Sequence, residues 1–144
     1  MENDLLPAQP VYKLYSDRAI YIGTFLGGPL VGGYMAAENF KQIGESEKAR
    51  STWLISIAVF IVILAAAFLL PAMKQVPNYL IPIIYAAIAR LLVKKYQGES
   101  INEHIQSGGL TFTTWRAVWI GLVGTAVFLT VAVIFALLAD KGLY

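Results

Sequence analysis

Four polar side chains are candidates for chemistry because they lie in or beside long apolar stretches: Glu38, Asn39, Arg90 and His104. Ionisable groups at membrane depth are costly and often serve ion or substrate pathways. Glu38 and Asn39 end the first apolar stretch, where Lys41 is a ready partner for the carboxylate and a solvated position is the simpler interpretation. In the alternative interpretation, Glu38 has a functional role, and Arg90 either lines an ion path or pairs with Glu38 across helices.

The remaining polar candidates favour no enzyme class. Arg90 lies near the end of the third apolar stretch, and its long stem can carry the guanidinium to the headgroup level. His104 follows Glu103 and could act as an acid or base, but a lone histidine in a chain without cysteine makes no metal site. Nucleotide-binding, metalloprotease and serine-hydrolase motifs are absent from the sequence. We therefore expect no enzyme, no metal and no cofactor, with intramembrane chemistry by Glu38, Arg90 and His104 as the alternative.

A second group of candidates consists of small residues around a central proline in segment 21–39, YIGTFLGGPLVGGYMAAEN. Their four-residue spacing recurs in rows that point in different directions, so neighbouring helices can approach closely on several sides. Pro29 also loosens the helix and exposes backbone carbonyls, as in many transporter sites. We predict helix packing as the main role of Gly23, Gly27, Gly28, Pro29, Gly32, Gly33, Ala36 and Ala37.

The elements that must position these residues are membrane helices. The chain has 144 residues, of which 58% are hydrophobic and 14% charged, and its mean hydropathy is +0.63. Crossing a hydrocarbon core of about 30 Å takes about 20 helical residues. The apolar stretches predict a single membrane domain, 1–144, folded as an all-α bundle of four transmembrane helices. After an N-terminal tail (1–17), the predicted helices are 18–40, 52–73, 77–96 and 115–139.

The two halves of the chain share short strings. Gly44-Glu45-Ser46 corresponds to Gly98-Glu99-Ser100, and Ser51-Thr52-Trp53 corresponds to Thr113-Thr114-Trp115. The strings suggest two tandem helical hairpins, and coincidence in short polar strings is the alternative. Ser100 and Glu103 also have the spacing of a capping box, which predicts a short interfacial helix that Gly108-Gly109 would end.

The Lys and Arg residues predict the orientation. The first and third connections hold seven of the eleven, whereas the opposite side holds four. Because Lys and Arg are retained in short cytoplasmic loops, we predict both termini outside, in a bacterial cytoplasmic (inner) membrane. The seven are Lys41, Lys48, Arg50, Arg90, Lys94, Lys95 and Arg116.

The sequence predicts a structural role more readily than a chemical one. Short connections leave no soluble domain, and a net charge of +2 gives no argument for nucleic acid. We expect a small assembly subunit, embedded in the lipid bilayer, that forms a homo-oligomer or docks in a larger membrane complex through its glycine-rich first helix. The alternative is a small oligomeric channel or transporter with its site at the Gly/Pro-interrupted first and third helices.

Overall fold

The computed structural model describes residues 10–142, and most of them are helical. The all-α class is therefore confirmed, while residues 1–9 of the predicted tail lie outside the described part. Two very short strands pair in parallel, Lys13 with Leu110 and Leu14 with Thr111. In chain order the elements are β1 (Lys13–Leu14), α1 (Asp17–Gly27), α2 (Pro29–Ile43), α3 (Ser46–Leu69), the 3-10 helix η1 (Pro71–Gln75), α4 (Leu80–Gln106), β2 (Leu110–Thr111) and α5 (Thr114–Asp140).

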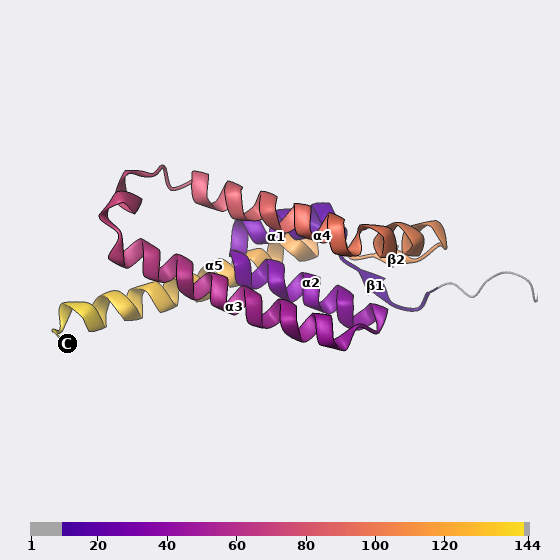
Figure 1. The fold of residues 1–144 in the computed structure, drawn as a ribbon, viewed down its shortest axis with the longest axis horizontal. Coiled ribbons are helices and arrows are strands. Elements are labelled where there is room, and N and C mark those ends of the chain that lie inside the picture. The colour runs from indigo at the N-terminus through magenta and orange to yellow at the C-terminus, as the bar shows by residue number, and fades with distance from the viewer. Residues whose placement is uncertain (1–9, 143–144) are drawn as a thin grey trace, which may run out of the picture.

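The first predicted transmembrane helix is two short helices that fold back on each other. Gly28 separates them with a φ of 82°, a left-handed conformation that glycine adopts without steric cost. Pro29 then begins α2 at a position where its missing N–H is not needed. Tyr15, which precedes α1, is hydrogen-bonded to Asn39 near the end of α2. Thus α1 and α2 form an antiparallel pair, which we call the hairpin (Figure 1).

The hairpin is too short to cross a membrane. With 11 and 15 residues, α1 and α2 extend about 16 Å and 22 Å, against a hydrocarbon core of about 30 Å. The prediction of one span over 18–40 is therefore wrong, because the chain reverses direction at Gly28. The reversal also places β1 and the C-terminal end of α5 at opposite ends of the molecule, contrary to the prediction that both termini share one side (Figure 1).

The three long helices are arranged around the hairpin. α3 packs along α2, whereas α4 and α5 pack chiefly along α1, and the long helices do not pack closely along one another. We call the end that holds β1, β2 and the α2–α3 turn the packed end. The opposite end, which holds η1 and the end of α5, is the splayed end (Figure 1). The glycine-rich stretch is thus central, as predicted, but it is a hairpin and the expected four-helix bundle is not confirmed.

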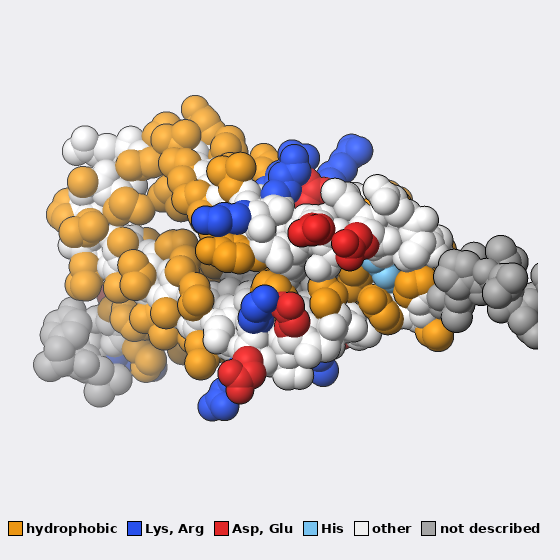
Figure 2. Space-filling view, turned by 45° about the vertical axis from the view of Figure 1, so that its right-hand side comes forward, with side chains coloured by type: hydrophobic (Ala, Val, Ile, Leu, Met, Phe, Trp, Pro, Cys, Tyr) orange, Lys and Arg blue, Asp and Glu red, His pale blue; other side chains and the backbone are white. Residues whose placement is uncertain are grey.

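Among the described residues, two helices are long and apolar enough to cross a membrane. They are α3 and α5, with hydropathies of 2.7 and 2.6 and almost no buried residues. The predicted helices 52–73 and 115–139 correspond to them, although α3 begins six residues earlier. The other two predicted spans are not confirmed. Figure 2 shows apolar side chains over one part of the surface and charged side chains gathered on the other.

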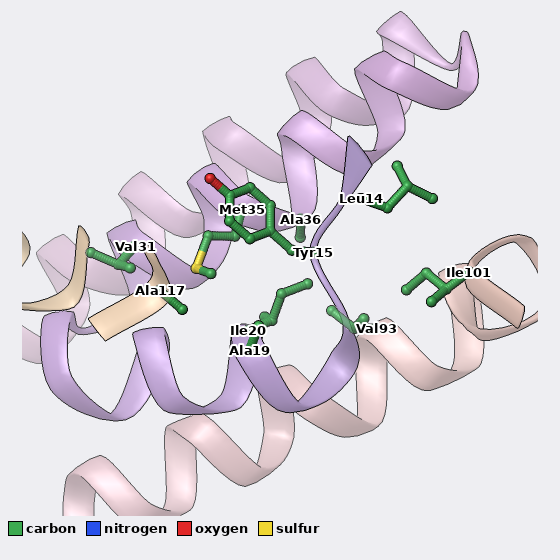
Figure 3. Packing of buried hydrophobic residues seen from close by; sticks show 10 residues of the cluster. All are labelled: Leu14, Tyr15, Ala19, Ile20, Val31, Met35, Ala36, Val93, Ile101 and Ala117. Atoms are coloured by element: carbon green, nitrogen blue, oxygen red, sulfur yellow. The ribbon is translucent and has the colours of Figure 1, made fainter. Parts of the chain in front are cut away.

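The hydrophobic core lies at the packed end. Leu14 and Tyr15 are fully buried and lie between α2 and α4 (Figure 3). Met35 of α2 closes one side of this core, and Val93 and Ile101 of α4 close the other. The extended segment before α1 is thereby enclosed by the hairpin and α4.

The shared strings of the two halves adopt different structures. Gly44 forms the left-handed turn between α2 and α3, with a φ of 90°, whereas Gly98 lies inside α4. Ser100 also lies inside α4, so the predicted separate interfacial helix is wrong. α4 runs unbroken to Gln106, and the chain turns at Gly108 with a φ of 83°. The two halves are therefore not two copies of one hairpin.

Candidate functional site

A buried cluster of amide groups joins three segments at the packed end. The Asn39 side chain accepts a hydrogen bond from the Tyr15 N–H (2.7 Å) and donates one to the Tyr15 carbonyl (2.8 Å). Its Nδ2 also faces the Gln97 Oε1 at 3.1 Å, and the Gln97 Nε2 donates to the Ala36 carbonyl at 2.8 Å. Both amide side chains are at most 1% exposed. Since each polar atom of the pair has a partner, the cluster holds α2, α4 and the segment before α1 together.

The other predicted polar residues do not join this cluster. The Glu38 carboxylate accepts a hydrogen bond from Gln42 one turn later, at 3.0 Å. Arg90 pairs with Asp17 at 3.0 Å, rather than with Glu38, and its guanidinium lies 5.8 Å from the Tyr21 ring centre. The structure therefore separates the four sequence candidates and does not bring them into one polar path.

His104 is buried and contacts Tyr12, which precedes β1, and Leu110 of β2. Its Nε2 lies 2.8 Å from the Leu110 carbonyl, which can only accept, so this nitrogen carries the proton. Its ring stacks on Tyr12 at 4.9 Å, and Gly109 is so close that a side chain there would meet the imidazole. The Nδ1 atom is buried and has no partner in the described part of the chain. His104 thus fixes the turn that leads into β2.

Arg116 links the start of α5 to the core. Its Nε donates to the Tyr15 hydroxyl at 2.9 Å, and its guanidinium lies 4.4 Å from the Phe112 ring centre. Burial raises the pKa of Tyr15 above its ordinary value, although the neighbouring Arg116 charge partly opposes this effect.

The small residues predicted to pack helices lie at contacts within the chain. A side-chain carbon added at Gly23, Gly27, Gly32 or Gly33 would meet a neighbouring helix or the other arm of the hairpin. Ala36 and Ala37 are also buried. Three pairs illustrate this: Gly23 faces Met35, Gly32 faces Thr24, and Gly33 faces Ser56. The chain's own helices therefore occupy much of the surface that the sequence assigned to partners.

The hairpin also packs closely on α5. A Cβ atom on Gly27 would lie 2.8 Å from the Gly121 carbonyl oxygen, and one on Gly124 would lie 3.0 Å from the Gly27 oxygen. Backbone thus packs directly on backbone. Sequence reasoning overlooked this partner, although Ala117, Gly121 and Thr125 repeat at the four-residue spacing that marks close helix contacts.

Gln97 was also overlooked. The buried residues of α4 are Ala86, Val93, Gln97, Ile101 and His104, which recur at the spacing of a single helix face. A glutamine on an otherwise apolar face indicates a buried hydrogen-bonding partner, and this signal was available in the sequence.

The apex of the hairpin, residues 25–30, carries unpaired backbone groups. The Leu26 carbonyl accepts a hydrogen bond from the Thr125 hydroxyl. In contrast, the Phe25 and Gly27 carbonyls and the Leu30 N–H have no hydrogen-bonding partner among residues 10–142. These groups lie at the C-terminal end of α1 and the N-terminal end of α2, where a helix has no intrahelical partners for its last carbonyls and first N–H groups.

The apex is also partly open. Gly28, Pro29 and Leu30 are all partly exposed. The Tyr85 hydroxyl of α4 approaches within 4.0 Å of the position that a Cβ on Gly28 would take. The apex therefore combines free backbone groups and a phenol in an otherwise apolar region.

The described residues hold no group of three or more His, Cys, Asp or Glu that could bind a metal ion. No family model matches the chain, and neither does any curated protein or solved structure. The functional argument therefore rests on the geometry of the hairpin and its neighbours.

Proposed function

We propose that this protein is a structural subunit of a membrane assembly, in which a partner helix covers the apex of the hairpin. One observation carries the proposal: the Phe25 carbonyl and the Leu30 N–H are unpaired, and both residues are at least partly exposed, whereas the Gly27 carbonyl is buried against Gly124 of α5. Irregular backbone at membrane depth is tolerated where protein buries it or where it lines a watery cavity. A polar side chain of a partner helix would satisfy these groups.

The depth of the apex supports this proposal. With the packed end at one membrane boundary, the 11 residues of α1 carry the apex about 16 Å inward, which is about half of the hydrocarbon core. An uncompensated polar group at that depth costs several kcal/mol. A second copy of the chain or another membrane protein would remove this cost.

We place the packed end in the cytoplasm of a bacterial cell. Of the eleven Lys and Arg residues, only Lys74 and Lys141 belong to the splayed end, which leaves nine near the packed end. The reversal at Gly28 moves Lys13 and Arg18 to the same side as the basic connections, so this bias is stronger than in the four-span arrangement. The N-terminal segment is then cytoplasmic, and the end of α5 is outside.

A channel or transporter is the second candidate, and the same apex favours it. Helix ends that meet near the middle of the membrane form the ion and substrate sites of many transporters. The free Phe25 carbonyl at the end of α1, the free Leu30 N–H at the start of α2 and the Tyr85 hydroxyl would contact water or a small solute. In this candidate, copies of the chain surround a path that passes the apex.

The mass of the complex extracted directly into native lipid discs tests the first proposal. We expect an oligomer or a heteromeric complex. An oligomer that conducts ions in liposomes would overturn the subunit proposal in favour of the channel, and a monomer would overturn both.

Single cysteines locate the interface, because the chain has none of its own. If the partner is a second copy, Leu30→Cys at the apex should form a disulfide between copies under mild oxidation. For a heteromer, the same cysteine carrying a photoreactive label should attach to the copurified subunit. The control is Leu91→Cys on α4, which is 67% exposed but distant in sequence from the apex. Equal cross-linking at both positions would contradict an interface at the apex.

A further inference from the structure

An apolar groove runs between α3 and α5 over the hairpin, with a volume of about 190 Å³. Gly27 and Gly124 line its floor, where the hairpin and α5 pack backbone against backbone. Phe60 and Phe128 line the groove and contact each other edge to face, with ring centres 5.9 Å apart. We call this cavity the α3/α5 groove.

Two further aromatic residues line the groove nearer the packed end. Tyr34 of α2 and Trp53 of α3 have ring centres 6.2 Å apart. Trp53 begins the apolar part of α3 and is 38% exposed, as expected of a residue at the headgroup level. Trp115 and Trp119 of α5 are more exposed still, at 72% and 65%. The groove therefore extends inward from the level where lipid headgroups meet lipid chains.

Arg116 lies on the same face of α5 as the groove residues, and its guanidinium has no carboxylate partner among residues 10–142. Arg116 precedes the groove residue Ile120 by one turn of α5, and Tyr34 is one of its electrostatic partners. Its Nε is bonded to the Tyr15 hydroxyl, and its planar group lies over the Phe112 ring. Neither of the two salt bridges found among residues 10–142 includes Arg116. The side chain is thus oriented by two aromatic residues, Tyr15 and Phe112, and neither of them neutralises its charge.

We propose that the α3/α5 groove binds a phospholipid of the cytoplasmic leaflet, with its acyl chain over Gly27 and Gly124 and its phosphate on Arg116. The charge of Arg116 and the size of the groove favour a phospholipid over a partner helix. An α-helix, about 10 Å wide, does not enter a groove of about 190 Å³, whereas part of one hydrocarbon chain can lie along it. An arginine recognises phosphate by paired hydrogen bonds, and cationic pockets between membrane helices bind anionic headgroups. The inference rests on the proposed membrane orientation but not on the assembly or channel role.

Quenching of Trp53 by brominated lipid tests the proposal. Substituting Trp115→Phe and Trp119→Phe leaves Trp53 as the single tryptophan. This protein is reconstituted in vesicles of phosphatidylcholine that contain a small fraction of either brominated phosphatidylglycerol or brominated phosphatidylcholine. We expect the anionic lipid to be enriched about fivefold next to Trp53, the effect of one basic residue near the surface.

Two substitutions, each with a matched control, separate the headgroup contact from the groove. Arg116→Gln should abolish the preference for phosphatidylglycerol, whereas Lys95→Gln on α4 should not. Val123→Phe narrows the groove and should reduce quenching by both lipids, whereas Val133→Phe, outside the groove, should not. Circular dichroism and thermal unfolding check that each variant is folded.

The possible failures are distinguishable. Equal quenching by the two lipids, or a preference that survives Arg116→Gln in folded protein, would overturn the lipid site and leave the assembly proposal intact. Absence of quenching by either lipid would show that Trp53 is not embedded, and would overturn the membrane orientation as well.

Discussion

The packed end and the splayed end differ in what each long helix has to pack against. At the packed end, the hairpin lies among α3, α4 and α5 and supplies glycine and alanine contacts to them. At the splayed end the hairpin is absent. There, α3 and α5 meet through large side chains such as Phe68 and Phe135, whose ring centres are 4.8 Å apart. The hydrophobic core is therefore confined to the packed end, because only there does the hairpin lie between the long helices.

Polar groups follow the same division. The packed end buries the Asn39 and Gln97 amides and His104, and it holds the paired Arg90. The side chains at the splayed end are mainly apolar and exposed, including Leu69 at 76%. A buried hydrogen-bonded cluster specifies one arrangement of its segments, whereas exposed apolar faces permit several neighbours. We infer that the packed end determines the fold and the splayed end is available to lipid or a partner.

The largest effect should come from the contact between the hairpin and α5. In Gly27→Leu, the new side chain would meet the Gly121 backbone, which cannot move without displacing α5. We expect no folded monodisperse protein on size-exclusion chromatography in detergent. Gly98→Ala in α4, where nothing lies within 4 Å, is the control and should be neutral or stabilising by up to about 1 kcal/mol. Normal folding of Gly27→Leu would contradict the close contact.

Removal of the central amide should have the next largest effect. Asn39→Leu leaves the Tyr15 backbone groups and the Gln97 oxygen buried without partners, at about 1–3 kcal/mol for each unsatisfied group. Thermal unfolding in detergent should show a large loss of stability. The exposed Asn102→Leu in α4 serves as the control. Equal stability of the two variants would mean that the cluster does not hold the packed end together.

Truncating one apolar side chain at the packed end and one at the splayed end tests whether only the packed end has a hydrophobic core. Met35→Ala removes a fully buried side chain at the packed end and should cost about 2–5 kcal/mol. Leu69→Ala, at the splayed end, should change the stability of the isolated chain by about 0.5 kcal/mol or less. Both are measured by thermal unfolding in the same detergent. A large cost at Leu69 would show that the splayed end has packing of its own.

The smallest effect should be a dependence of stability on alkaline pH. Burial raises the pKa of Tyr15 in the folded state, so the unfolded state loses its phenolic proton first. The contribution of neutral Tyr15 is fully present below the ordinary tyrosine pKa of about 10 and is lost as the pH rises through the higher folded value. The slope of stability against pH should be steeper in the wild type than in Tyr15→Phe above about pH 10. Parallel curves would exclude Tyr15 as the source.

Several features of the candidate site could be predicted from residue types. The glycine-rich stretch was correctly placed at the centre, and Asn39 was named among its polar residues. Its true partner, Gln97, was not, because the pairing joins residues 58 positions apart. Arg90 was considered as a partner for Glu38, yet it pairs with Asp17, which the reversal of the chain brings next to α4.

The sequence by itself determined the all-α class and the approximate positions of the two most apolar helices. α5 at Thr114–Asp140 nearly matches the predicted 115–139, whereas α3 at Ser46–Leu69 begins six residues before the predicted 52–73. Hydropathy suffices there because an unbroken apolar segment in lipid must satisfy its own backbone hydrogen bonds. Only the tertiary structure decided that the chain turns back at Gly28. Hydropathy is the same for a straight helix and for one that reverses, whereas a single left-handed φ changes the side on which everything before it lies.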